Sequence, residues 1–427
     1  MMIKKGIIVT VIFMTIFLTG CSGNKNSDKL TIYVESYTNS ILGLDTAVQM
    51  YQQYYPESEI NVEYFDDSEV YSTRIKGELL SGEGPDVIIT DSTSFEDVYL
   101  SMRSGAFAPI DEYIETNEVF SESVINRILL QAGQYEGTQY VVPLCFSVPC
   151  IVTTQENVDA YGLDVSYSDY NGFLDMIENY YKEGNTQRLF NAENSGFIFM
   201  NHSGEKLVDY KNNTFVANSE LIRRSCDVYK YYYEATTEDS YHGSYDCYDD
   251  LTSGYSVTGC FFEGGISAPI YHMARLNNKA TPVLLSVPNI DGGIVAYAEY
   301  GAAIRNNSTK KEEAINFISI LLSDEIQKHI ADWYAPVRSS TLTGTLSECR
   351  SVFAAANSYD DVVFKYIEDD MLYYNYFKIH TSGITECKFR SIESIAPYAY
   401  SYYVTGEDTF ENCTADAKDV FDIYLSE

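Results

Sequence analysis

Apolar and polar residues alternate with two different periods along the first part of the chain. Short apolar runs typical of strands are followed by stretches in which apolar residues recur with the period of a helix. Such strand and helix segments are predicted in turn at residues 30–34, 44–55, 60–65, 71–79, 87–89 and 95–102. Repeated strand–helix units favour a mostly parallel sheet with helices on both faces.

The pattern changes at residues 137–154, where two extended apolar runs lie on either side of Pro149. We interpret this change as a point at which the chain crosses between domains. Further elements are predicted at residues 168–181, 219–233, 259–262, 281–288, 300–304 and 309–321, and residues 347–427 are mainly helical in pattern. Ser168 and Ser219 are candidate N-caps of two of these helices.

The first 21 residues have the layout of a secretory signal. A basic start precedes an apolar run at residues 7–18, which is too short to span a bilayer, and small residues precede Cys21. This layout resembles the bacterial lipobox, in which the cysteine receives a diacylglycerol anchor and becomes the mature N-terminus. We expect a signal peptide at residues 1–20, a lipid-anchored tether at 21–28, and a protein on the extracytoplasmic face of the cell membrane. An ordinary signal peptide with an incidental cysteine is the alternative.

Charge and composition narrow the choice of partners. A formal net charge of −34 repels nucleic acid and anionic lipid headgroups, so we expect neither as a partner. The same charge favours a soluble, monomeric exported protein. The chain has 39 tyrosines, whose rings stack and whose hydroxyls form hydrogen bonds, as suits amphipathic ligands such as sugars. Most of these tyrosines are nevertheless expected in ordinary core and surface positions.

Sequence motifs for catalysis and for cofactor binding are absent. There is no nucleophile elbow, P-loop, HExxH motif or dinucleotide fingerprint. The five histidines are scattered and the acidic runs lack the spacing of a calcium loop, so we expect no metal site and no cofactor. Eight cysteines follow Cys21 without a CxxC pair, and their disulfide pairing stays open. The chain is therefore expected not to be an enzyme.

Six further stretches carry a resemblance to a known family. They are residues 79–87 (LLSGEGPDV), 104–111 (SGAFAPID), 135–143 (YEGTQYVVP), 261–265 (FFEGG), 311–322 (KEEAINFISILL) and 335–338 (APVR). Each is weak alone, but together and in this order they resemble the extracellular solute-binding proteins of ATP-driven (ABC) sugar importers, of the maltose-binding-protein type. The lipobox is similar to that of the Gram-positive members.

The resemblance implies an α/β, periplasmic-binding-protein-like fold. Two lobes, each a mostly parallel sheet flanked by helices, would hold the ligand in the cleft between them. We expect lobe 1 at residues 29–141 plus 292–330, and lobe 2 at residues 142–291 plus 331–427. The implied function is capture of a solute, a sugar or oligosaccharide in the first instance, for ABC permease subunits. A peptide, a polyamine or a metal chelate stays open as the ligand.

Candidate ligand contacts follow from the strand ends and from the resemblance. Glu35 and Tyr37 come just past the first strand and Asp91 just past the third, where carboxylates can accept hydrogen bonds from sugar hydroxyls. Glu263 matches a family position at which the chain enters the cleft. The remaining candidates, near the crossings, are Phe146, Tyr300, Trp333 and Arg338.

Each candidate also has a structural interpretation, which stays open. The carboxylates could cap helices or lie in solvated loops, Phe146 could be a buried hinge aromatic, and Arg338 could form an ion pair. Two features depart from the family. Trp333 is the single tryptophan, whereas members that bind maltooligosaccharides have several, and Tyr300-Gly301-Ala302 stands where a Gly-Gly pair is more usual.

Two other functions remain as alternatives. The first is a surface glycan-binding or sensory protein that acts without import. The second is a glycoside hydrolase, which would need two carboxylates at a defined separation across a cleft.

Overall fold

The structure is a computed structural model that describes residues 29–91, 98–191, 199–216, 219–236, 247–261, 266–276, 280–354 and 370–426. The predicted signal peptide, the tether with Cys21, and Glu263 lie outside the described residues.

Seven strands form the larger sheet, in the order β14-β6-β13-β3-β1-β2, with β15 paired to β13. They are β1 (Lys29–Glu35), β2 (Glu59–Phe65), β3 (Val87–Asp91), β6 (Val141–Ser147), β13 (Ile294–Ile304), β14 (Ala335–Pro336) and β15 (Ile384–Phe389). Strand β1 is parallel to β2 and β3, whereas β13 is antiparallel to both β3 and β6. The sheet is therefore mixed, not mostly parallel, because β13 enters its middle from the other sheet.

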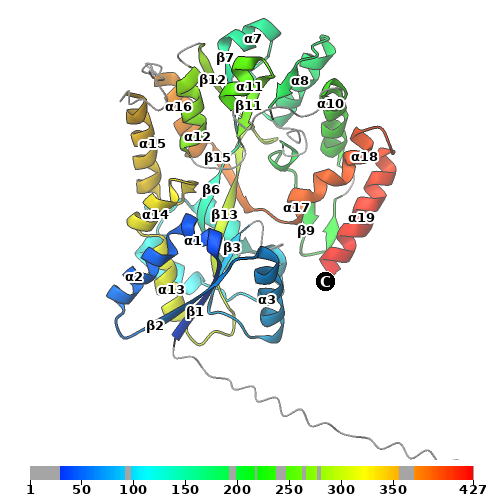
Figure 1. The fold of residues 1–427 in the computed structure, drawn as a ribbon. Helices are drawn as coiled ribbons and strands as arrows, with labels where there is room; N and C mark the ends of the chain where they lie inside the picture. The colour runs from blue at the N-terminus through cyan, green and yellow to red at the C-terminus, as the bar shows by residue number, and fades with distance from the viewer. Residues whose placement is uncertain are drawn as a thin grey trace, which may run out of the picture.

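Helices cover both faces of this sheet (Figure 1). They include α1 (Ser36–Leu42), α2 (Leu44–Tyr54), α3 (Ser68–Ser81), α13 (Lys311–Leu321) and α14 (Asp324–Ile330), with the shorter α4 (Val98–Arg103), α5 (Asp111–Thr116), η1 (Glu118–Phe120), α6 (Arg127–Leu130) and η2 (Gln131–Gly133). A small hairpin is formed by β4 (Gln134–Tyr135) and β5 (Thr138–Gln139). Between α1 and α2, Gly43 has a φ of 62°, and a Cβ there would meet the His329 ring at 2.9 Å, so only glycine fits this close approach.

Four strands form the second sheet, in the order β12-β7-β11-β8. They are β7 (Cys150–Thr154), β8 (Arg188–Phe190), β11 (Ser256–Phe261) and β12 (Pro282–Ser286). Strand β11 is parallel to β8 but antiparallel to β7, so this sheet is mixed as well.

The helices around the second sheet come from two parts of the chain. The first part contributes α7 (Gln155–Tyr161), α8 (Tyr170–Lys182), α10 (Glu220–Thr236), α11 (Cys247–Ser253) and α12 (Ser267–Leu276). The second contributes α15 (Ser339–Ala354), α16 (Asp370–His380), α17 (Ile392–Ile395), η3 (Ala396–Tyr400), α18 (Ser401–Val404) and α19 (Phe410–Ser426). Strands β9 (Val208–Asp209) and β10 (Thr214–Phe215) form a separate pair. Each sheet and the helices around it form one body of the molecule. Figure 1 shows the two bodies one above the other, with the long β13 running between them.

Two clusters of buried apolar residues fill these bodies. One surrounds the larger sheet, and the other lies among the second sheet, α8, α10 and α19. Neighbouring residues of β7 face different clusters, Cys150 and Val152 the first and Ile151 the second, as the alternation of a strand requires. Strands β14 and β15 belong to the larger sheet although residues 331–427 were expected in lobe 2. The exact lobe boundaries stay a prediction.

The chain passes between the sheets at three short segments: from β6 to β7, from β12 to β13, and from β15 to α17. The buried Glu299 and several half-buried charged groups meet there. The Arg390 guanidinium lies 3.2 Å from Glu299 Oε1, and Ser147 donates a hydrogen bond to the same carboxylate. Nearby, Lys388 pairs with Glu393 at 3.2 Å, and the backbone N–H of Leu207 donates to Glu393.

Residues of the body around the second sheet pack against these charged groups at the crossings. The Tyr297 hydroxyl donates to the carbonyl of Asn201 at 2.9 Å, and the buried His202 contacts the Tyr297 ring edge-on with ring centroids 5.2 Å apart. Burial, assisted by the charge of Arg390, lowers the pKa of His202 to about 3. Burial likewise lowers the pKa of His380, in α16, to about 4.

We expect Arg390→Gln to destabilise the protein by about 3–5 kcal/mol, because it leaves the buried Glu299 without its cation. The double variant Glu299→Gln/Arg390→Gln should recover part of this loss, since no buried charge is then unpaired. Urea unfolding measures both. The control is Arg127→Gln, which breaks an exposed pair with Glu122 and should cost no more than about 1 kcal/mol. Equal costs for Arg390→Gln and the control would contradict this role.

Stability should fall between pH 7 and pH 5 partly because of His202 and His380. A folded-state pKa below the unfolded value of about 6.5 stabilises the protein above pH 6.5, and this stabilisation is lost as the pH falls. At pH 5 each histidine accounts for about 2 kcal/mol of lost unfolding free energy. His202→Gln should reduce the drop measured by urea unfolding, whereas His329→Gln, at an exposed histidine, should not. An unchanged drop in the His202 variant would refute the assignment.

Candidate functional site

The carboxyl ends of the parallel strands in the two sheets face one another across the crossings. In the larger sheet, β1 and β3 end at Glu35 and Asp91. Because β3 is antiparallel to β13, its end at Asp91 points toward the segment through which the chain enters β13. In the second sheet, Phe261 at the end of β11 pairs with Cys150, which follows the crossing from β6. Ligands of open α/β sheets bind at such carboxyl ends. The loops that follow β3, β8 and β11, at residues 92–97, 192–198 and 262–265, lie outside the described residues.

Glu35 and Asp91 form the acidic part of this edge. Both side chains are 6% exposed. One carboxylate oxygen of Glu35 is buried and has no hydrogen-bond partner among the described residues. Burial raises the pKa of Glu35, the negative charges of Asp91 and Asp67 raise it further, and a hydrogen bond from Ser68 opposes the rise. The edge therefore offers a desolvated acceptor oxygen to a ligand that can donate a hydrogen bond.

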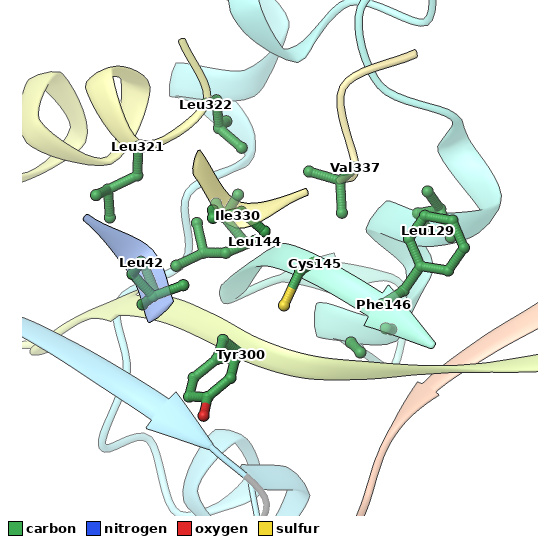
Figure 2. Packing of buried hydrophobic residues seen from close by; sticks show 14 of the residues in the cluster. Leu42, Leu129, Leu144, Cys145, Phe146, Tyr300, Leu321, Leu322, Ile330 and Val337 are labelled. Carbon is green, nitrogen blue, oxygen red and sulfur yellow. The ribbon is translucent and has the colours of Figure 1, made fainter. Parts of the chain in front are cut away.

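Tyr300 lies opposite Asp91 in the β3–β13 ladder. Its side chain is buried, and its ring meets that of Tyr334 with centroids 5.7 Å apart. Burial raises the pKa of Tyr300, and the charges of Tyr334 and Asp91 act in the same direction. In Figure 2 the Tyr300 hydroxyl points away from the apolar residues Leu144 and Cys145. Tyr300 thus brings a hydroxyl group to the same edge as the two carboxylates.

Exposed aromatic rings flank the acidic edge. Tyr37, in α1 directly after Glu35, is 66% exposed, and Trp333, which follows α14, is 42% exposed. Helices α1 and α14 pack against each other. Tyr334 connects this aromatic group to Tyr300 through the ring contact described above. Rings of this kind can stack on the apolar face of a sugar.

Phe146 and Arg338 have contacts within the protein that account for them. Phe146 is fully buried in β6, opposite Ala298 and Ala335, and lies among the apolar residues of the larger core (Figure 2). Arg338 pairs with Asp324 at 2.6 Å and donates to the carbonyl of Leu322 at 3.2 Å. These are the structural interpretations that the sequence left open.

Sequence reasoning missed the polar residues at the crossings. Glu299, Ser147 and Arg390 were not among the candidates, nor was Thr90, whose buried hydroxyl oxygen has no partner among the described residues. A signal for Glu299 was present, because it is the one charged residue within the apolar strand IVAYAEYGAAI. A lone charge in a buried strand usually has a partner in the fold.

The described residues contain no cluster of histidine, cysteine or acidic side chains able to hold a metal ion. Cys145, Cys150, Cys226, Cys260, Cys387 and Cys413 are free thiols. Burial raises the pKa of Cys150 to about 12, which disfavours its thiolate form at neutral pH. Among the described helices, none combines the length and apolar character that crossing a bilayer requires.

Residues 46–347 match the sequence profile of a family described as bacterial extracellular solute-binding protein. This match covers well over half of the chain. No curated protein sequence is similar enough to this chain to count as a match.

Solved structures of low sequence identity share the fold. The sugar-binding protein MalE from Xanthomonas citri is 12% identical, with 93% of this chain and 97% of that chain covered and a TM-score of 0.66. The cyclic α-maltosyl-1,6-maltose binding protein from Arthrobacter globiformis is 14% identical, with 93% and 98% covered and a TM-score of 0.60. An ABC transporter solute-binding protein from Thermotoga lettingae, bound with α-D-tagatose, is 13% identical, with 93% and 99% covered and a TM-score of 0.55. These likenesses confirm the expected two-lobed α/β fold.

Glu35→Gln should stabilise the protein at neutral pH. A raised folded-state pKa means that the carboxyl group favours folding at low pH and that this contribution is lost as the pH rises through the folded pKa. Removing the charge should therefore increase the unfolding free energy at pH 7, with no gain near pH 4. Thermal melts at both pH values, with the exposed Glu57→Gln as control, measure the effect. A less stable Glu35 variant at pH 7 would argue against a buried, desolvated carboxylate.

Proposed function

The chain belongs to the family of bacterial extracellular solute-binding proteins, and on that basis we propose that it captures a sugar or oligosaccharide and delivers it to an ABC importer. We propose a sugar as the ligand because two buried carboxylates, Glu35 and Asp91, lie beside exposed aromatic rings. In this proposal the protein binds its ligand reversibly and does not cleave it.

The chemistry of the edge suits a polyhydroxylated, uncharged ligand. A carboxylate accepts hydrogen bonds from two sugar hydroxyls, and these bonds are strong because the acceptor is charged and removed from water. An anionic ligand would meet Glu35 and Asp91 as like charges. The rings of Tyr37 and Trp333 supply the stacking surfaces that other members obtain from several tryptophans.

The solved relatives support a carbohydrate ligand. The proteins from Xanthomonas citri, Arthrobacter globiformis and Thermotoga lettingae are each named for, or bound with, a sugar.

We propose Glu35, Tyr37, Asp91, Tyr300 and Trp333 as ligand contacts, with Glu263 retained from the sequence resemblance. Phe146 and Arg338 are left out because the core and an ion pair account for them. We further propose that Cys21 carries a diacylglycerol anchor that holds the protein, as a monomer, at the outer face of the cell membrane beside its permease. Radiolabelled palmitate incorporation that is lost in Cys21→Ala tests the anchor.

The binding test is isothermal titration calorimetry with maltose, maltotriose, cyclic maltooligosaccharides and tagatose, with amino acids and polyamines as controls. For the sugar that binds, Asp91→Asn should weaken affinity about tenfold or more, because a charged acceptor is lost. Trp333→Ala should weaken it about fivefold to tenfold if the ring stacks on the sugar. The matched control is Asp416→Asn on the exposed face of α19.

Recovery of the bound sugar by chromatography separates binding from catalysis. Intact sugar supports a binding protein, whereas cleaved sugar would favour a glycoside hydrolase. A heat of binding that is measured only with an amino acid or a polyamine, and with none of the sugars, would overturn the carbohydrate assignment. Equal affinities of Asp91→Asn and Asp416→Asn would remove Asp91 from the site.

A further inference from the structure

A cavity of about 240 Å³ lies away from the acidic edge. Its lining comes from β12, from Val165 and Tyr167, from the beginning of β13, from α16, and from Gly383 at the start of β15. None of the proposed sugar contacts lines it. Strand β12 is the edge strand of the second sheet, and the cavity lies beside it. Its volume suits a ligand smaller than a drug-sized molecule.

The open edge of β12 presents unpaired peptide groups to this cavity. In the β7–β12 ladder the N–H of Gln155 donates to the carbonyl of Thr281, which identifies that pair as hydrogen-bonded. Because such pairs alternate along an antiparallel ladder, the peptide groups of Leu284 and Ser286 point away from β7. The Tyr167 hydroxyl confirms this direction, since it donates to the outward carbonyl of Ser286 at 2.9 Å. The N–H and C=O of Leu284 therefore face the cavity as a donor and an acceptor.

Helix α16 supplies a cation and an amide opposite this edge. Lys378 and Asn375 lie one turn apart on the helix, and both line the cavity. Lys378 is exposed, and its ammonium forms no ion pair among the described residues. Apolar walls are supplied by Leu285, Ile294 and Ile379. The cavity thus combines an unpaired sheet edge, one positive charge and an apolar surface.

We propose that this cavity binds a free dipeptide with an apolar side chain. The C-terminal residue of the ligand would pair with Leu284, its N–H donating to the Leu284 C=O and one carboxylate oxygen accepting from the Leu284 N–H, as when an extended peptide adds to a sheet edge. Its terminal carboxylate would meet Lys378, and its side chain would lie against the apolar walls. A neutral sugar would leave the Lys378 charge unused, and an inorganic anion without a hydrogen-bond donor would leave the C=O of Leu284 unpaired.

The location of the cavity links it to the crossings. Ile294 and Gly383 are where the chain enters β13 and β15, the strands that connect the two bodies. A ligand that touches both of them and β12 contacts both sheets. If the relative position of the sheets changes on sugar binding, the two ligands alter each other's affinity by the same factor.

The test is calorimetric titration of the purified protein with L-alanyl-L-leucine, and with L-alanyl-L-leucinamide, which lacks the carboxylate. We expect the dipeptide to bind and the amide to bind about tenfold more weakly. Lys378→Gln should reduce dipeptide affinity about tenfold and remove the preference for the carboxylate. Asn375→Trp should block binding by filling the cavity from a partly exposed helix position. Lys418→Gln, at an exposed lysine of α19, is the matched control.

Two outcomes would overturn the proposal. The first is an absence of dipeptide binding, or binding that neither Lys378→Gln nor Asn375→Trp changes. The second is competition between the dipeptide and a sugar, with loss of dipeptide binding in Asp91→Asn, which would place the peptide at the acidic edge. Thermal melts of each variant show whether it is folded. Because the titration needs no sugar, its result is independent of the carbohydrate assignment.

Discussion

The ion pair between the buried Glu299 and the half-buried Arg390 is the interaction on which the arrangement of the two bodies depends. Together with Ser147 it joins the end of β6, the middle of β13 and the end of β15, so one cluster holds all three crossing segments. Charges buried in this way interact strongly only when their geometry is well defined. The pair therefore specifies how the crossing strands lie beside one another, and through them how the second sheet meets the first.

The acidic edge depends on the same strand. Tyr300 follows Glu299 directly and lies opposite Asp91, so β13 both carries the ion pair and positions one wall of the proposed sugar site. The cavity beside β12 is reached by the first residues of that strand. Two sites of different chemistry, one acidic and aromatic and the other with a lysine and a free sheet edge, thus share one structural connection. Any rearrangement at the crossings would therefore change the geometry of both proposed sites.

Local elements were predicted well where the hydrophobic pattern was strong. The strands expected at residues 30–34, 60–65 and 87–89 correspond to β1, β2 and β3, and the hydroxyl of Ser219 accepts a hydrogen bond from Ile222 N–H at the start of α10. Ser168 was a wrong choice of cap, because Asp169 accepts the corresponding bond from Gly172 and the helix begins one residue later. Helix α1 was not predicted, because its seven residues are too few to show a period.

The sequence by itself determined the apolar segments, the exclusion of common catalytic motifs, the family resemblance and two of the acidic residues, Glu35 and Asp91, at strand ends. Only the tertiary structure decided that the sheets are mixed, that Phe146 and Arg338 have roles within the protein, and that Glu299 meets Arg390. The reason is physical. Hydrophobic periodicity reports which face of a segment is buried, whereas strand direction and buried charge pairs depend on contacts between residues far apart in the chain, such as Ser147 and Glu299.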